Sequence, residues 1–261
     1  MAKDNHNAVD RVADILDFVA SSKGGTTFTE IVRALAIPKS SLHPLVHTLC
    51  KRRFLHYREN EQKYGLGDRI FSLGAQYGNN VGLLGMINDV LSGLAGDVGE
   101  TCCFGVLAGN EVLYLLMQVA PGPIQVTARP GYRLKAYASA IGKSLLSRFG
   151  KDELLAMYPE GFASITKNTV TDMDKLCRQL SEGRENGFFY EKEESSEHIQ
   201  CVAMPVFCHQ KIAAALSIAF PIFSEVPDPE KVKNNKEKLA GACKEIEGLI
   251  TRHREEWNYG D

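Results

Sequence analysis

The sequence lacks the features of a secreted or membrane protein. It has no N-terminal apolar run of the signal-peptide type, and no stretch approaches the roughly 18 consecutive apolar residues that a membrane span requires. Its seven cysteines form no C-x-x-C pair, and an odd number of them without a secretion signal favours reduced thiols over a disulfide framework. We therefore expect a soluble, cytoplasmic chain with no membrane partner.

Sequence motifs of catalysis and of metal binding are also missing. There is no serine-centred nucleophile elbow, no H-E-x-x-H motif and no phosphate-binding loop. Cys201 and His198 suggest a thiolate pair, but residues three apart on a strand point to opposite faces. A zinc site made of His198, Glu191 and Cys201 matches no closed structural spacing. The sequence favours a binding protein without metal or cofactor, and a Cys-dependent enzyme is the alternative.

Charge is distributed unevenly along the 261 residues, whose net charge is −2. Residues 1–78 carry 11 Lys and Arg against 8 Asp and Glu, whereas the remainder carries 19 against 24. The length favours two domains, and a basic N-terminal third is typical of a domain that binds an anionic partner such as nucleic acid.

Two helices are predicted at the start of the chain. The segment NAVDRVADILDFVASS repeats apolar residues at helical spacing, and Gly24 and Gly25 end it. A second helix begins after Thr27, which forms a capping box with Glu30. Pro38 ends that helix early, because the residue before a proline avoids the helical region.

A third helix is expected to begin near Ser41 and to run to the basic cluster at 51–53. If Ser41 caps it, Pro44 falls in the first turn, where a missing N–H costs little; otherwise the helix bends at Pro44. Two short helices joined by three or four residues are typical of a helix-turn-helix, whose second helix enters the DNA major groove.

A β-hairpin follows, because residues 55–57 and 63–66 flank a polar turn at 59–62. The hairpin makes the domain a winged helix-turn-helix. Side chains of the right size for phosphates and base edges are expected to contact double-stranded operator DNA: Thr29, Lys39, Ser40, Ser41, His43, His47, Arg58 and Lys63.

The order of several blocks resembles the IclR family of bacterial transcription regulators: FTEIVRALAIPKSSLHPLVHTL, YGLGDRIFSLG, GETCCFGVLAGNEVLYL, GYRLKAYASAIGKSLL, EKEESSEHIQCVAMPVF and AAALSIAFP. The resemblance implies an α+β chain with a winged helix-turn-helix (5–68), a linker helix (69–90) and a GAF-like effector domain (83–257). It also implies a homodimer or a dimer of dimers. Two positions depart from the family pattern, since Pro44 replaces a common Arg and Ala36 replaces a common Gly.

The second domain is predicted to hold an antiparallel sheet covered by helices, an α+β architecture. Expected strands are 103–107, 112–119, 124–128, 187–190, 201–207 and 213–220, and expected helices lie after Leu73 and near 138–149, 171–186 and 229–256.

The segment AYASAIGKSLL is the candidate anion site, because small residues at a helix start leave amides open to a ligand carboxylate. Those amides belong to Ala140, Ile141 and Gly142. The resemblance adds four effector contacts on facing strands, with Ala219 in place of the family's second serine: Glu191, Ile199, Cys201 and Ser217.

Simpler readings of these residues remain open. The small residues at the helix start could simply allow close packing, and Cys201 could be a small core residue. A solvated turn could contain Glu191, Glu193 and Glu194, and Lys143 could be a surface charge. Nothing in Tyr132, Tyr137 or Phe220 distinguishes an aromatic acid, a sugar acid or a keto acid.

We expect a ligand-responsive regulator, a repressor of a catabolic operon or alternatively an activator, in which a small carboxylate changes the placement of the winged domains.

Overall fold

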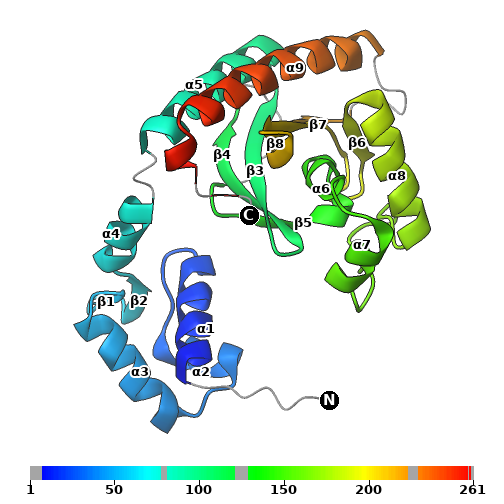
Figure 1. Cartoon of the computed structure of the whole chain (residues 1–261). Helices are drawn as coiled ribbons and strands as arrows, with labels where there is room; N and C mark the ends of the chain where they lie inside the picture. Colours follow the sequence, from blue (N-terminus) through cyan, green and yellow to red (C-terminus); the bar gives the residue numbers. More distant parts are fainter. Residues whose placement is uncertain (1–7, 78–80, 121–128, 223–228, 258, 260–261) are drawn as a thin grey trace. The chain divides into compact units, whose positions relative to one another are not determined.

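A computed structural model describes residues 8–77, 81–120, 129–222, 229–257 and 259. The chain divides into two compact units, residues 1–79 and 80–261. Figure 1 shows the helices and strands of each unit. Among the described residues, no helix combines the length and the apolar character needed to cross a bilayer.

The N-terminal unit consists of helices and a hairpin, as predicted. Its elements are α1 (Ala8–Ser21), α2 (Phe28–Leu35), α3 (Lys39–Lys51), β1 (Leu55–Arg58), β2 (Lys63–Leu66) and α4 (Asp68–Tyr77). Apolar residues of α1, α2, α3, β1 and the turn between α2 and α3 share one core: Ile15, Val19, Ile31, Ile37, Leu42, Val46, Leu49 and Leu55. Because α3 contributes three of these residues, its opposite face is left to solvent.

The ends of α2 follow the predicted local chemistry. The Thr27 side chain accepts a hydrogen bond from Glu30 N, and Glu30 Oε2 accepts one from Thr27 N at 2.7 Å, which completes the capping box. At its other end Ala36 adopts a left-handed conformation, with φ at 50°. That conformation strains a residue with a Cβ, so the tight turn between α2 and α3 forms despite the missing glycine.

The predicted start of α3 is wrong. The helix begins at Lys39, with Pro38 as its N-cap, and no side chain caps it. Leu42 N donates to Pro38 O at 2.9 Å, so the N-cap is Pro38, three residues before the expected cap Ser41. Pro44 therefore lies inside the helix rather than at its start, and Ser41 is not its cap.

The wing is the short antiparallel hairpin β1–β2, paired from Leu55 with Leu66 to Arg58 with Lys63. Thr26 and Tyr64 exchange two backbone hydrogen bonds of 2.9 and 2.7 Å, which tie the hairpin to the loop before α2. The winged helix-turn-helix predicted from the sequence is confirmed.

The C-terminal unit is an α+β structure built on a six-stranded antiparallel sheet of order β5-β4-β3-β8-β7-β6. The strands are β3 (Thr101–Ala108), β4 (Glu111–Gln118), β5 (Arg133–Lys135), β6 (Phe189–Lys192), β7 (Ile199–Cys208) and β8 (Lys211–Pro221). The helices are α5 (Val81–Val98), α6 (Ala140–Leu146), α7 (Lys151–Met157), α8 (Met173–Asn186) and α9 (Pro229–Arg252), with short 3₁₀ turns η1 (Ala136–Ala138) and η2 (Arg254–Glu256).

Helices cover both faces of this sheet, as Figure 1 shows. On one face α5 and α9 bury apolar residues such as Leu91 and Ile246 against Phe104 and Leu216. On the other face α6 and α8 pack through Ile141 and other apolar residues against the sheet. The predicted class, an antiparallel sheet covered by helices, is confirmed.

Several predicted limits shift or fall outside the described residues. The strand expected at 187–190 is found at Phe189–Lys192, and the strand expected at 124–128 lies outside the described residues. The short strand β5 and helix α7 were not predicted. Helices α4 and α5 lie in the region of the expected linker helix, but residues 78–80 are outside the described part of the chain, so a continuous helix over 69–90 stays a prediction.

Candidate functional site

The first candidate site is the exposed face of α3. Leu42, Val46 and Leu49 are buried at helical spacing and fix the orientation of the helix in its own unit. Ser40, His43 and His47 are exposed away from this buried row, Lys39 is exposed at the first residue of the helix, and Ser41 is half-buried. The structure thus leaves Lys39, Ser40, His43 and His47 accessible along α3, as a major-groove reader requires.

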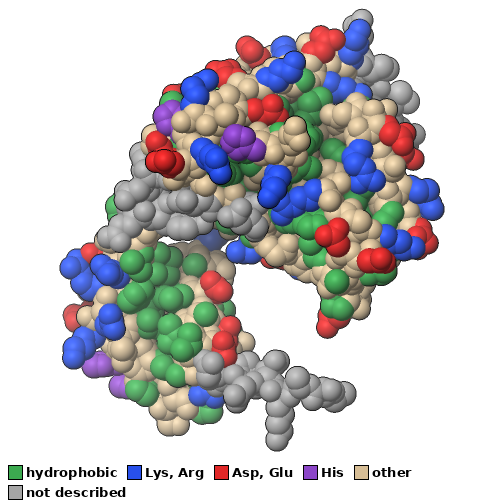
Figure 2. Space-filling view, in the orientation of Figure 1, with side chains coloured by type: hydrophobic (Ala, Val, Ile, Leu, Met, Phe, Trp, Pro, Cys, Tyr) green, Lys and Arg blue, Asp and Glu red, His purple; other side chains and the backbone are tan. Residues whose placement is uncertain are grey.

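The hairpin and α2 supply the remaining predicted contacts. Arg58 and Thr29 are exposed, and Lys63 is half-buried. The Arg58 guanidinium donates to His56 Nε2 at 3.1 Å and lies 3.4 Å from Glu61 Oε2. An exposed ion pair of this kind contributes little free energy, so a phosphate can compete for the arginine. In Figure 2 lysine, arginine and histidine side chains gather along the outer edge of this unit, over α3 and the hairpin.

The second candidate site lies on the sheet face that α6 covers. Strand register places Glu191 opposite Cys201, and Cys201 opposite Ala219, in one row across β6, β7 and β8. Ser217 lies opposite Cys103 in the next row on the same face. Directly opposite residues of antiparallel strands share a face, so Glu191, Cys201 and Ser217 lie on one surface, as expected. Ile199 lies two residues before Cys201 and shares this face.

The start of α6 is more occupied than the sequence suggested. Ser139 is the N-cap, and its Oγ accepts a hydrogen bond from Gly142 N at 3.1 Å. The Gly142 amide is therefore committed to the cap, which leaves Ala140 and Ile141 as the predicted amide donors. Both residues are fully buried on the side of α6 that faces the sheet.

A buried charge cluster links α6 to the turn after β6. Lys143 is only 1 % exposed, and its Nζ lies 2.5 Å from Glu194 Oε1. Glu191 is also 1 % exposed; its Oε2 accepts a hydrogen bond from Glu194 N at 2.8 Å, and its Oε1 accepts one from Ser195 Oγ at 3.0 Å. The readings of Lys143 as a surface charge and of Glu191 and Glu194 as a solvated turn are therefore wrong.

Comparison with known proteins decides the family. Residues 8–59 match the IclR helix-turn-helix domain, and residues 75–247 match the bacterial transcriptional regulator IclR C-terminal domain. The chain belongs to the IclR family of transcription regulators.

Named relatives agree with this assignment. The chain is 30% identical over 240 residues to the HTH-type transcriptional regulator XynR of Escherichia coli K12, covering 90% of this chain and 93% of that protein. It is 27% identical over 223 residues to the HTH-type transcriptional repressor AllR of the same strain, covering 85% and 82%. An IclR homologue from Microbacterium hydrocarbonoxydans, solved in complex with 4-hydroxybenzoate, superposes with a TM-score of 0.82 at 24% identity, covering 95% of this chain and 100% of that chain.

Members of the IclR family are regulators rather than enzymes, and the chemistry of Cys201 agrees. Burial raises the pKa of the Cys201 thiol well above its usual value, and the neighbouring Glu191 carboxylate raises it further. His198 lies in the turn before β7, with its side chain 83 % exposed and 3.7 Å from Glu193 Oε1. A buried neutral thiol and a solvent-exposed imidazole do not form a nucleophile pair. Among the described residues, no group of three or more His, Cys, Asp or Glu is arranged to hold a metal ion.

The Glu191 carboxyl makes stability depend on pH. Burial raises its pKa. The hydrogen bonds that it accepts from Glu194 N, Cys201 and Ser195 lower the pKa, as does the positive charge of Lys143, but burial is the larger effect. Because the pKa of Glu191 is higher in the folded protein, this carboxyl contributes fully to stability below its pKa in the unfolded chain, about 4.5. That contribution is lost as the pH rises through the pKa in the folded protein.

We expect the free energy of unfolding of the wild type, measured relative to Glu191→Gln, to increase as the pH falls from 7 to 5. Glutamine does not titrate, so the difference between the two proteins isolates this carboxyl. Urea unfolding of both proteins at the two pH values measures it. A difference that is unchanged, or that moves the other way, would show that Glu191 is not the buried carboxyl described above.

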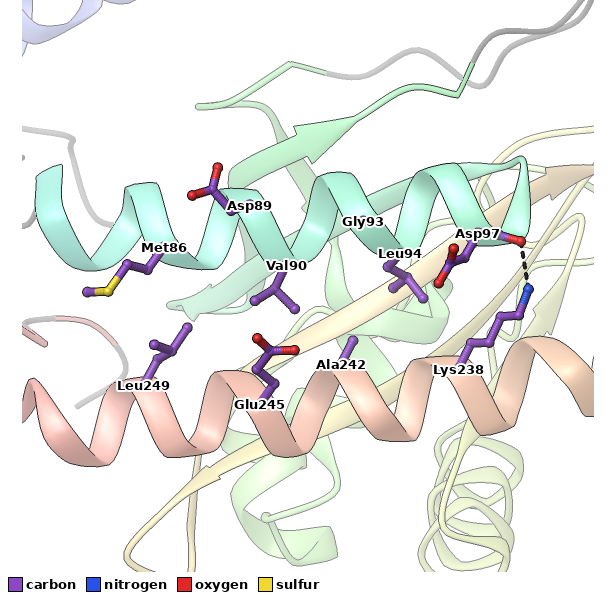
Figure 3. A pocket seen from close by; sticks show the side chains of 10 residues that line it. All are labelled: Met86, Asp89, Val90, Gly93, Leu94, Asp97, Lys238, Ala242, Glu245 and Leu249. Atoms are coloured by element: carbon purple, nitrogen blue, oxygen red, sulfur yellow. Dashed lines mark hydrogen bonds between the residues drawn. The ribbon is translucent and has the colours of Figure 1, made fainter.

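The C-terminal unit also has two hollows that the sequence did not predict. One of about 520 Å³ runs between α5 and α9, where Lys238 Nζ donates to Asp97 O at 2.6 Å (Figure 3). Acidic side chains of both helices, Asp89, Asp97 and Glu245, lie along it. The other, of about 720 Å³, lies at the sheet edge near the end of β7. Neither hollow is lined by the predicted effector residues.

Proposed function

We propose that this protein is a repressor of a catabolic operon that binds double-stranded operator DNA and leaves it when a small carboxylate binds the C-terminal unit. The observation that carries the DNA half is the exposure of Lys39, Ser40, His43 and His47 along α3, while Leu42, Val46 and Leu49 hold the helix to the core. The basic surplus of the N-terminal third supports it, because phosphate neutralisation supplies much of the affinity for DNA. Such a regulator acts in the cytoplasm.

The effector half rests on the sheet face under α6. Polar groups of Glu191, Cys201 and Ser217 face α6, whose start supplies the Ala140 and Ile141 amides. A protein of the same fold binds 4-hydroxybenzoate, which is a small carboxylate. Lys143 is paired with Glu194 beside this face, so the Ala140 and Ile141 amides and the Ser217 hydroxyl, rather than a free charge, would hold the carboxylate.

The proposed switch needs two states with different affinities for DNA. In a homodimer or a dimer of dimers, two recognition helices must match the spacing of two half-sites. Effector binding that changes their separation would weaken DNA binding by a coupling free energy of about 1–3 kcal/mol, or roughly 5- to 150-fold.

The DNA half is tested with the variant Lys39→Ala/Arg58→Ala. Each phosphate contact that is lost should weaken binding and reduce the slope of log affinity against log salt by about 1 per contact. Fluorescence anisotropy with the DNA upstream of the protein's own gene measures both. Lys167→Ala, which removes an exposed lysine of the C-terminal unit, is the matched control and should bind as the wild type does. Unchanged affinity and slope in the double variant would remove α3 and the wing as the interface.

The effector half is tested by thermal shift with 4-hydroxybenzoate, gluconate and 2-oxobutanoate. A ligand at a hundredfold excess over its Kd adds about 2.7 kcal/mol to stability. The shift should shrink in Ser217→Ala, while that variant keeps wild-type DNA affinity without ligand. A carboxylate that raises DNA affinity in the same anisotropy assay would favour the alternative, an activator.

A further inference from the structure

The hollow at the sheet edge exists because two neighbouring strands differ in length. Strand β6 is four residues long and pairs with β7 only as far as Phe189 opposite Ala203. Strand β7 continues to Cys208, so Met204–Cys208 have no strand on their outer side. Helix α9 closes the space from one face of the sheet, and the ends of α6 and α8 close it from the other. The result is a cavity of about 720 Å³, large enough for a small organic molecule.

The floor of this cavity is apolar. Phe189, Ile212 and Cys243 are buried beneath it, and Met204 and Pro205 of β7 are half-buried. Phe207 lies at its edge with 40 % of its surface exposed. A ligand with an apolar body would therefore remove from water both its own apolar surface and that of the cavity floor.

The rim of the cavity is positively charged. Arg148, Arg184, Lys211 and Lys244 line it, against one carboxylate, Glu247. Backbone contacts position the two arginines: Arg148 donates to Ile212 O at 3.2 Å, and Arg184 donates to Ser147 O at 2.8 Å. This surplus reverses the sign of the acidic C-terminal part of the chain, in which Asp and Glu outnumber Lys and Arg. The local potential favours an anion.

The open edge of β7 does not suit an added peptide strand. A strand that joins a sheet edge needs free backbone N–H donors. Pro205 has none, and Phe207 N already donates to Glu247 Oε1 at 2.9 Å. This bond also engages the one rim carboxylate. A proline and a capped amide are devices that prevent edge-to-edge pairing, so the cavity suits a small molecule better than a peptide.

We propose that this cavity is a second ligand site, separate from the predicted effector site, for an amphipathic organic anion with an apolar aromatic or aliphatic body. The body would lie on Met204, Pro205 and Phe207, and the anionic group would lie among Lys211, Lys244 and the two arginines. None of these residues belongs to the predicted effector set, so the proposal stands whether or not a carboxylate binds under α6.

The test compares two dyes that share a ring system and differ in charge. 1-Anilinonaphthalene-8-sulfonate is anionic, and N-phenyl-1-naphthylamine is its neutral counterpart; both fluoresce more strongly in an apolar site. We expect the full-length protein to bind the sulfonate at least tenfold more tightly than the amine. In Lys211→Glu/Lys244→Glu the Kd of the sulfonate should rise at least tenfold, while the Kd of the amine should change less than twofold.

Lys233→Glu is the matched control, because it reverses an exposed lysine of the same helix α9 that does not line the cavity. It should bind both dyes as the wild type does. Lys211→Gln/Lys244→Gln replaces the double reversal if that variant melts earlier than the wild type. Equal affinity of the wild type for the two dyes would overturn the proposal. So would an unchanged sulfonate Kd in the double variant, or an equal loss in Lys233→Glu.

Discussion

Replacing Lys143 by methionine is expected to destabilise the C-terminal unit by about 3–5 kcal/mol, because it leaves buried carboxylates without their cation. Lys143 is almost fully buried, and its ammonium is 2.5 Å from Glu194 Oε1. Burial lowers the pKa of Lys143, and the Glu194 charge opposes that effect. Methionine has a similar volume, so the loss would come from charge and hydrogen bonding rather than from a cavity. Urea unfolding at pH 7 gives the change in free energy.

The double variant Lys143→Met/Glu194→Gln provides the control. It removes both members of the ion pair, and replacing a whole buried pair by neutral residues is often close to neutral. We therefore expect it to be more stable than Lys143→Met alone, and the double-mutant cycle measures the coupling between the two residues. A single variant that loses less than about 1 kcal/mol would mean that water reaches the Glu194 carboxylate once the lysine is gone.

This cluster also marks a limit of sequence-based inference. A lysine near the start of a helix and glutamates such as Glu191 and Glu194 are normally exposed, and composition gives no reason to bury them. Their burial follows from the register of β6 with β7 and from the packing of α6 on the sheet, which are contacts between distant parts of the chain. The family resemblance named Glu191, Cys201 and Ser217 together, and strand register places all three on one face of the sheet; their role in effector binding stays a prediction.

Local chemistry was predicted more accurately than long-range pairing. The Thr27–Glu30 capping box and the β1–β2 hairpin depend on residues a few positions apart, and both form as expected. Strand β5 pairs with β4 across a connection that includes residues outside the described part of the chain, and nothing in three residues of sequence indicates that pairing. The sheet-edge cavity depends on the unequal lengths of β6 and β7, and so it also lies beyond the sequence.

The start of α3 shows how two local rules can compete. Ser41 is a good capping residue, and a start there would have placed Pro44 in the first turn, at little cost. Instead Pro38, whose fixed φ of −55° suits a helix entrance, becomes the N-cap and α3 gains an extra half-turn before Ser41. The buried position of Leu42 against the unit's core fixes the helix in this register. Tertiary packing thus outweighs the preference of a single cap.

Pro44→Ala is consequently expected to stabilise the N-terminal unit by roughly 1–3 kcal/mol. Pro44 is the sixth residue of α3 and has no N–H to donate to the carbonyl of Ser40, four residues earlier. Alanine restores that hydrogen bond and removes the clash of the proline ring with the same carbonyl. Pro44 is exposed, so the substitution leaves the core unchanged. Part of the gain is offset, because alanine gives the unfolded chain more conformational freedom.

Pro38→Ala is the matched control for this prediction, since it makes the same substitution six residues earlier, at the N-cap, where no helical hydrogen bond is missing. It should leave stability unchanged or lower it slightly, through the greater freedom of the unfolded chain. Thermal unfolding of the wild type and both variants, followed by circular dichroism, compares the two sites. If Pro44→Ala gains nothing over Pro38→Ala, the Ser40 carbonyl is already fully satisfied by solvent and α3 has adapted to its interior proline. A gain confined to Pro44→Ala would instead mean that α3 gives up stability at its interior proline.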